Sequence, residues 1–134
     1  MPQTIKVLVI EDEPAMQKVL KSFFTDFFAG AKRNFEIEMY ADSMQGLFEL
    51  NNHGEQYHII VLDIMLPKIS GDEIFNSLLH TNPEITKRVL FSTATPDVVT
   101  ERFDDLNLHV LQKPFSFPVF CEKVKGVLIA QQKK

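Results

Sequence analysis

The amino-acid sequence lacks several features that would point to particular classes of protein. It has 134 residues, a single cysteine (Cys121), no tryptophan and a formal net charge of −4. One cysteine cannot form an internal disulfide or a cysteine-rich metal cluster, so we expect a reducing, cytoplasmic setting. The acidic balance argues against a nucleic-acid surface, which normally carries an excess of Lys and Arg. No apolar run approaches the roughly 20 residues of a membrane span, and the N-terminus does not resemble a signal peptide.

The rest of the composition is that of an ordinary folded domain. Hydrophobic residues make up 45% of the chain and charged residues 24%, close to the average for globular proteins. The length suits one domain, so we expect a single domain over residues 1–134, with its core at about 4–130 and no output domain. Phenylalanine is unusually frequent, with 12 residues against two tyrosines. We expect most of these rings to lie on helix faces that pack against a sheet.

Five short segments predict β-strands. Four of them are apolar runs rich in Val, Ile and Leu, at residues 5–10, 59–62, 89–91 and 110–111. Such runs are typical of strands buried on both faces of a parallel sheet. The fifth segment, residues 35–40, alternates apolar and acidic side chains, which predicts an edge strand with one wet face.

Amphipathic helical patterns lie between the predicted strands, over residues 16–27, 44–48, 74–79, 98–103 and 117–128. Residues suited to helix starts precede or open these patterns, namely Pro14, Asp42-Ser43, Ser70 with Glu73 as a capping box, Thr95-Pro96 and Ser116. Strand and helix thus alternate five times with short connections. This order predicts an α/β fold, a doubly wound five-stranded parallel sheet with five helices on its two faces.

The carboxyl ends of four predicted strands carry the reactive side chains, which are Glu11, Asp12, Asp63, Ser92, Thr93 and Lys113. Because these ends meet at one edge of a parallel sheet, we expect the side chains to lie close together. Neighbouring carboxylates repel one another, so the cluster needs a cation or a proton at neutral pH. Oxygen ligands without His or Cys favour a hard ion, above all Mg²⁺. With a lysine, a hydroxyl and a carboxylate nucleophile, the set is suited to phosphoryl transfer.

Each of these residues also has an ordinary structural explanation. Asp12 can cap the first helix, Thr93 can cap the fourth, and Lys113 can be a surface residue. Separate structural roles of this kind nevertheless do not readily explain why acidic, hydroxyl and basic side chains occur together at four strand ends. We therefore interpret the cluster as a functional site.

Four segments of the sequence resemble the signatures of a known family. They are Ile-Lys-Val-Leu-Val-Ile-Glu-Asp-Glu-Pro (5–14), Val-Leu-Asp-Ile-Met-Leu-Pro-Lys-Ile-Ser-Gly (61–71), Leu-Phe-Ser-Thr-Ala (90–94) and Gln-Lys-Pro-Phe (112–115). Their order and spacing resemble the response-regulator receiver domains of two-component signalling, over roughly residues 4–130. The resemblance implies the CheY-like, flavodoxin-like (βα)5 fold, and a signalling phosphoprotein that catalyses its own phosphotransfer and dephosphorylation.

The resemblance also implies roles for individual residues in a Mg²⁺-dependent phosphorelay. Asp63 would be the phosphoacceptor, taking a phosphoryl group from the phosphohistidine of a sensor histidine kinase or a histidine phosphotransfer protein. Glu11, Asp12 and Asp63 would hold the Mg²⁺ ion, together with the backbone carbonyl of Met65. The phosphorylated chain would signal to a downstream protein target by contact, with no nucleic acid and no membrane involved.

Four further positions have roles in the same resemblance. The hydroxyl of Thr93 would donate to one phosphoryl oxygen, and the ammonium of Lys113 would pair with another. The small side chain of Ala94 would leave the phosphoryl group accessible. The peptide before Pro114 would be cis, as is usual for the family's Lys-Pro pair.

Val110 departs from the family pattern, which usually has Tyr or Phe three residues before the lysine. That ring turns inward when the threonine moves toward the phosphoryl group. Valine has no ring to switch, so the coupling from site to output either is altered or runs through main-chain shifts. The chain can accordingly also be interpreted as a pseudo-receiver, an interaction module whose binding does not depend on phosphorylation.

The second departure is extra length between Asp12 and Asp63, which we place around residues 27–34. On a helix with 100° per residue, Phe24 and Phe28 fall on the flank of the apolar stripe. One hypothesis is that the two rings contribute to a surface that docks the kinase or phosphotransfer helix. The alternative is that the extended loop buries them.

Overall fold

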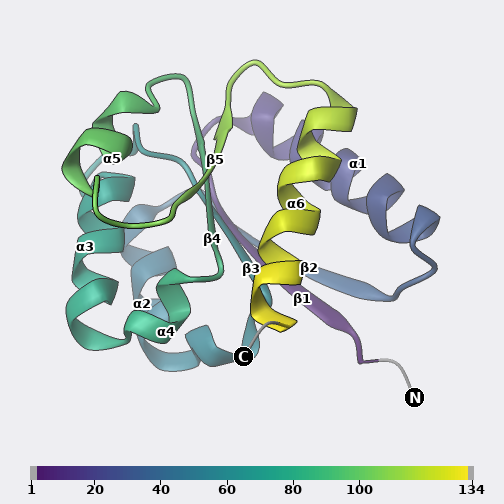
Figure 1. Cartoon of the computed structure of the whole chain (residues 1–134), viewed down its shortest axis with the longest axis horizontal. Helices are drawn as coiled ribbons and strands as arrows, with labels where there is room; N and C mark the ends of the chain where they lie inside the picture. The colour runs from purple at the N-terminus through teal and green to yellow at the C-terminus, as the bar shows by residue number, and fades with distance from the viewer. Residues whose placement is uncertain (1–2, 133–134) are drawn as a thin grey trace.

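The computed structural model describes residues 3–132 and contains one five-stranded sheet (Figure 1). Its strands are β1 (Ile5–Ile10), β2 (Phe35–Tyr40), β3 (Ile59–Leu62), β4 (Val89–Thr93) and β5 (His109–Gln112). All pairings are parallel, in the order β2-β1-β3-β4-β5. The five predicted strands and their parallel arrangement are confirmed. β2 lies at an edge, with Glu36 and Glu38 exposed, as its alternating pattern predicts.

The helices are α1 (Pro14–Gly30), α2 (Ser43–His53), α3 (Gly71–Thr81), α4 (Pro83–Thr86), α5 (Asp97–Arg102) and α6 (Phe117–Gln132), with a 3₁₀ turn, η1 (Gly54–Gln56). α1 and α6 cover one face of the sheet, and α2, α3, α4 and α5 cover the other (Figure 1). None of the helices in residues 3–132 is long and apolar enough to span a membrane.

Residues 3–132 thus contain six α-helices, whereas the sequence predicted five. The additional helix is α4, which the search for amphipathic patterns did not detect. It has four residues, too few for an apolar stripe, and buries only Ile85. Pro83 opens it and is preorganised for a first helical turn.

The predicted helix starts are correct in part. Pro14 opens α1, and the Asp42 carboxylate accepts from the Met44 and Gln45 amides at 2.8 and 3.1 Å at the start of α2. The Ser116 hydroxyl accepts from Val119 N at 3.4 Å at the start of α6.

Two predicted caps are wrong. Ser70 occupies the N-cap of α3, but its side chain makes no cap hydrogen bond. Its expected capping-box partner, Glu73, instead pairs with Arg102 of α5 at 2.6 Å. α5 has Pro96 rather than Thr95 at its N-cap, because the Thr95 side chain turns back toward Thr93. At α3 the ion pair with Arg102 replaces the expected cap. At α5 the contact of Thr95 with Thr93 at the strand end replaces it.

The sheet separates two apolar clusters that share the phenylalanines unequally. Eight rings lie on the α1 and α6 side, namely Phe23, Phe24, Phe27, Phe28, Phe35, Phe115, Phe117 and Phe120. Three lie on the other side, Phe75, Phe91 and Phe103, while Phe48 on α2 is 68% exposed. The expectation that most rings pack on the sheet is confirmed.

The docking hypothesis for Phe24 and Phe28 is wrong, since both rings are buried. Phe24 contacts Phe120 of α6 at a centroid distance of 4.8 Å, and Phe28 contacts Phe35 of β2 at 5.0 Å. The sheet and α6 bury them, rather than an extended loop. α1 is apolar over so wide an arc that its periodicity does not determine which part of the arc faces the core.

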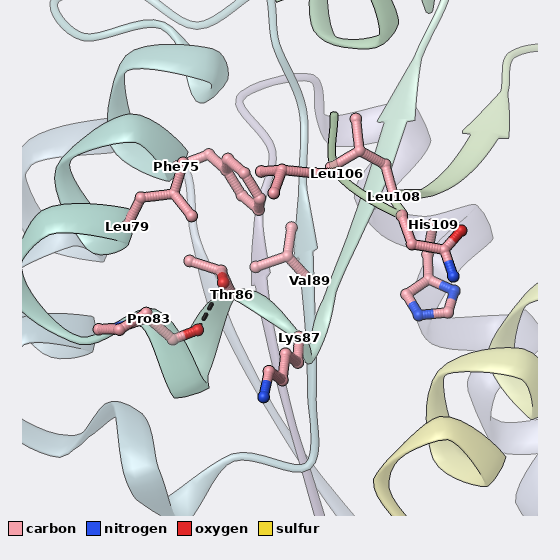
Figure 2. A pocket seen from close by; sticks show the side chains of 10 residues that line it. Phe75, Leu79, Pro83, Thr86, Lys87, Val89, Leu106, Leu108 and His109 are labelled. Carbon is pink, nitrogen blue, oxygen red and sulfur yellow. Dashed lines mark hydrogen bonds between the residues drawn. The ribbon is translucent and has the colours of Figure 1, made fainter. Parts of the chain in front are cut away.

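The short α4 also forms one wall of a pocket of about 300 Å³, shown in Figure 2. Phe75 and Leu79 of α3 line it on one side, and Leu106 and Leu108 on the other. Figure 2 shows the polar ends of its basic residues directed away from this apolar space. The pocket can take apolar groups, but its polar atoms do not converge as they do at a chemical site.

Candidate functional site

Three carboxylates meet where β1 and β3 end. Glu11 and Asp12 follow β1, and Asp63 follows β3, which pairs directly with β1. One carboxylate oxygen from each residue lies within 4.8 Å of the others. Glu11 and Asp63 are buried, with 1% and 5% exposure, whereas Asp12 is open to solvent. The expected acidic cluster is therefore present, and one member faces solvent.

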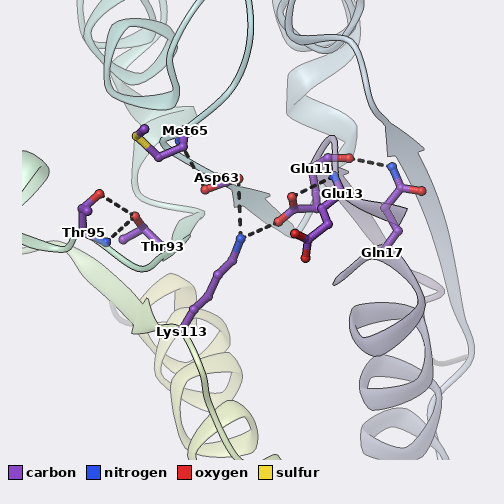
Figure 3. Close-up of polar contacts among 8 residues, drawn as sticks. All are labelled: Glu11, Glu13, Gln17, Asp63, Met65, Thr93, Thr95 and Lys113. Atoms are coloured by element: carbon purple, nitrogen blue, oxygen red, sulfur yellow. Dashed lines mark hydrogen bonds and ion pairs between the residues drawn. The ribbon is translucent and has the colours of Figure 1, made fainter. Parts of the chain in front are cut away.

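Lys113 reaches this cluster from the end of β5 (Figure 3). Its ammonium donates to Glu11 Oε1 at 2.8 Å and lies 3.5 Å from Asp63 Oδ2. Its backbone amide donates to Thr93 O at 2.8 Å, which holds the lysine beside the end of β4. The Lys113-Pro114 peptide is cis, as the resemblance in the sequence implied.

The pKa values of Glu11 and Lys113 are shifted by their shared burial and mutual contact. Burial, and then the charge of Asp63, raise the pKa of the Glu11 carboxyl against the opposing hydrogen bond from Lys113. Burial alone would lower the pKa of Lys113, but its hydrogen bond to Glu11 and the charges of both carboxylates raise it. The lysine is therefore a fixed positive charge at neutral pH.

The donor set fits a hard divalent cation. Three carboxylates face one ammonium, so the cluster keeps an excess of negative charge. All of the side-chain donor atoms in the cluster are oxygens, which Mg²⁺ prefers in proteins. Met65 N–H donates to Asp63 Oδ1 at 3.3 Å, so the main chain of residue 65 lies beside the same carboxylate. The Met65 side chain itself is 67% exposed.

The hydroxyl of Thr93 is buried at the end of β4 and engaged by Thr95. Thr93 Oγ1 accepts from Thr95 N at 2.9 Å and lies 3.1 Å from Thr95 Oγ1. Ala94, between them, is exposed. Because side chains alternate along a strand, Ser92 shares the face of Leu90, toward α1 and α6. The hydroxyl pair expected from the sequence is therefore divided between the two faces of the sheet.

The loop after Asp63 is held close by Gly71, the first residue of α3. Its amide donates to Ile64 O at 2.9 Å, and a Cβ at this position would lie 2.0 Å from Asp63 O. Only glycine allows this approach of α3 to the site. The Ser43 hydroxyl ties the same loop to α2, donating to Pro67 O at 2.6 Å and accepting from Ile69 N at 3.2 Å.

Two residues at or near the site were missed by the sequence reasoning. Gln17 of α1 donates to Glu11 O at 2.6 Å and fixes the main chain of the acidic turn (Figure 3). Arg102 of α5 bridges Asp72 and Glu73 in the first turn of α3, at 2.6 Å from each. Gln17 lies about one turn into the predicted helix, which is a usable signal for a contact with its start. The sequence holds no comparable signal for Arg102.

Val110 lies on β5, partly buried against the α5 side of the core. It lines a hollow of about 550 Å³ together with Pro96, Thr100 and Val119. The family's usual ring is thus replaced by a small side chain beside open space.

Comparison with known proteins identifies the family. The chain belongs to the response regulator receiver domain family, whose model matches residues 7–125. Transcriptional activator protein IrlR of Burkholderia pseudomallei is 32% identical over 129 residues, covering 92% of this chain and 50% of IrlR. The chain spans about half the length of these curated relatives, which include IrlR and two further transcriptional regulatory proteins.

Two solved structures share the fold. A response regulator receiver domain protein from Clostridium thermocellum has a TM-score of 0.79 at 18% identity, covering 96% of this chain and 97% of its own. The receiver domain of sensor histidine kinase PA1611 from Pseudomonas aeruginosa has a TM-score of 0.75 at 17% identity, covering 94% and 98%. That structure holds a magnesium ion coordinated in the active site cleft. The resemblance of fold and family noted in the sequence is confirmed.

Proposed function

We propose that the chain is the phosphoacceptor receiver of a two-component phosphorelay and that Asp63 is its phosphorylation site. The observation that carries this proposal is the position of the Asp63 carboxylate. It is 5% exposed, grouped with the oxygens of Glu11 and Asp12, and 3.5 Å from the ammonium of Lys113. A carboxylate so placed can act as a nucleophile toward a phosphoryl group that its neighbours orient and neutralise.

Glu11, Asp12, Asp63 and the backbone carbonyl of Met65 are the groups we expect to hold Mg²⁺. When bound, the ion supplies positive charge that offsets the carboxylates and the incoming phosphoryl oxygens. The acidic cluster and the magnesium ion in the PA1611 receiver support this assignment.

In the proposed transfer, an Asp63 oxygen attacks phosphorus and the bond from phosphorus to the partner's histidine nitrogen breaks. The imidazole keeps that electron pair and takes up a proton, and Asp63 becomes an acyl phosphate. Lys113 pairs with one phosphoryl oxygen, and Thr93 donates its hydroxyl to another after leaving Thr95. Hydrolysis of the acyl phosphate by the same site resets the chain.

The phosphoryl donor in this proposal is a sensor histidine kinase or a histidine phosphotransfer protein, and the output is contact with a downstream protein in the cytoplasm. Val110 supports one alternative, a pseudo-receiver whose contacts do not depend on phosphorylation. The two differ in whether Asp63 is modified at all.

Incubation with Mg²⁺ and acetyl phosphate, followed by intact-mass spectrometry, tests the proposal. We expect the wild-type chain to gain one phosphoryl group, to gain none when Mg²⁺ is chelated beforehand, and to lose the group again in Mg²⁺ buffer after the donor is removed. Asp63→Asn should gain none, and Asp26→Asn, an exposed change on α1, should behave as wild type. An unlabelled wild-type chain, or a label that persists in Asp63→Asn, would defeat the proposal.

A further inference from the structure

A further cavity lies at the end of the sheet opposite the acidic site. It has a volume of about 420 Å³ and opens between the end of α1, the second half of α6 and the start of β1. Ile5, Phe27, Phe28 and Leu128 form its apolar wall. The volume is within the range of about 300–1,000 Å³ that is usual for small-molecule sites.

The charged side chains that line this cavity are both basic. Arg33 and Lys125 line it, and no Asp or Glu is among the described residues that do so. Arg33 donates one N–H to Gln3 O at 2.8 Å, and a guanidinium has five such donors. The cavity therefore combines an apolar wall with two positively charged side chains, Arg33 and Lys125.

His58 also lines the cavity and is a third residue with an N–H donor, besides Arg33 and Lys125. Its Nδ1 accepts from Lys6 N at 3.0 Å, so the neutral ring carries its proton on Nε2. Gln131 donates from Nε2 to His58 O at 2.6 Å and fixes the histidine main chain at the cavity wall. The donors come from three separate segments of the chain, the turn after α1, the residue before β3, and α6.

We propose that this cavity binds a small organic anion with an apolar body, a free carboxylic acid taken from solution. The carboxylate would pair with Arg33 and Lys125, and its hydrocarbon part would lie on the half-buried side chains of Phe27 and Leu128. The same cations repel a positively charged ligand, and a small inorganic anion would leave the apolar wall uncovered. The segment of extra length singled out in the sequence, residues 27–34, supplies much of this cavity.

Titration with decanoate tests the proposal, followed by amide resonances in ¹H–¹⁵N spectra and by calorimetry. We expect shifts centred on the residues that line the cavity, and binding about tenfold weaker for decanol, which lacks the charge, and for acetate, which lacks the chain. Arg33→Ala and Lys125→Ala should each weaken decanoate binding by about tenfold. Lys21→Ala, which removes an exposed lysine elsewhere on α1, is the matched control and should bind as wild type.

A variant that blocks the cavity with a large side chain tests the proposal without removing a charge. Ala31 is exposed at the mouth of the cavity, so Ala31→Trp can fill it without altering the core and should abolish binding. Asp63→Asn should bind decanoate as wild type, since the acidic site lies at the other end of the sheet. The proposal is overturned if decanoate shifts no cavity residue, shifts the pocket of Figure 2 instead, or binds the Arg33, Lys125 and Ala31 variants as tightly as wild type.

Discussion

The side chain of Thr93 is held by Thr95, two residues further along the chain. Thr95 donates its amide to Thr93 Oγ1 at 2.9 Å, and the two hydroxyl oxygens lie 3.1 Å apart. In the proposed transfer Thr93 must give up this hydroxyl contact to donate to a phosphoryl oxygen. The pair therefore stabilises the unphosphorylated arrangement of the loop after β4.

Replacing Thr95 should make phosphorylation easier. Thr95→Val keeps the amide donor and removes the hydroxyl, which eliminates one neutral hydrogen bond of about 0.5–1.5 kcal/mol. We expect the rate of phosphorylation by acetyl phosphate to rise about two- to tenfold. Thr25→Val is the control, because the hydroxyl of Thr25 bonds to Lys21 O within α1. A Thr95→Val rate equal to or below the wild-type rate would mean that this hydrogen bond does not restrain Thr93.

The acidic cluster should lower stability until a cation binds. Asp63→Asn removes one of three neighbouring carboxylates, so we expect the free energy of unfolding to rise by about 1 kcal/mol in metal-free buffer. Wild type should gain about 1.4 kcal/mol when Mg²⁺ is present at about ten times its Kd. Urea unfolding with and without Mg²⁺ measures both effects. An equal response of wild type and Asp63→Asn to Mg²⁺ would contradict the assignment of Asp63 as a ligand.

Gly71 should tolerate no side chain, because its Cβ would collide with the carbonyl oxygen of Asp63. We expect Gly71→Ala to lower the free energy of unfolding by about 3 kcal/mol, the upper end for overpacking. Gly30→Ala is a matched control, since nothing lies within 4 Å of its Cβ position at the end of α1. That change should leave stability unchanged or raise it by up to about 1 kcal/mol. Similar losses in both variants would show that the close approach at Gly71 is not the cause.

Stability should fall as the pH drops below neutrality, in part because of His58. Burial, and then the charges of Arg88 and Arg33, lower the pKa of His58 below its ordinary 6.5. The unfolded chain therefore takes up a proton near that pH while the folded chain resists it. The stability that the neutral His58 ring contributes is present above about pH 6.5. It is lost as the pH falls from there through the lower pKa of the folded state.

Thermal unfolding between about pH 8 and pH 5 measures this dependence. His58→Asn retains an acceptor for the Lys6 amide and should flatten the loss of stability in that window. His80→Asn, at an exposed position on α3, is the comparison. A slope for His58→Asn as steep as that of wild type would assign the pH dependence to other groups. His109 is one such group, because burial and then Lys123 lower its pKa.

The sequence predicts the sheet and the site well because both depend on short-range patterns. The apolar runs before Glu11 and Asp63 are strands, and parallel pairing of β1 with β3 brings the two carboxylates together. Orientation within a helix is harder to predict. α1 is apolar over a wide arc, so Phe24 and Phe28 were expected at its flank and are in fact buried.

Contacts between distant segments account for most other differences. Glu73 has the spacing of a capping box, yet it pairs with Arg102, 29 residues further along the chain. α4 contributes a single buried side chain, Ile85, and leaves no periodic signal. The partner of Glu73 and the burial of Ile85 depend on how helices and strands pack against one another, which the local sequence does not encode.

The unequal sharing of phenylalanine rings between the two sides of the sheet affects the order in which the molecule opens. The side with eight rings is built from helices of 17 and 16 residues, whereas α5 on the other side has only six. So short a helix depends on its packing, here through Val99 and Phe103, and little on its own hydrogen bonds. α5 should therefore open locally more readily than α6, with its amides exchanging with solvent before those of α6. Because α5 follows closely after Thr93 and Thr95, a weakly protected helix adjoins the reactive end of the sheet.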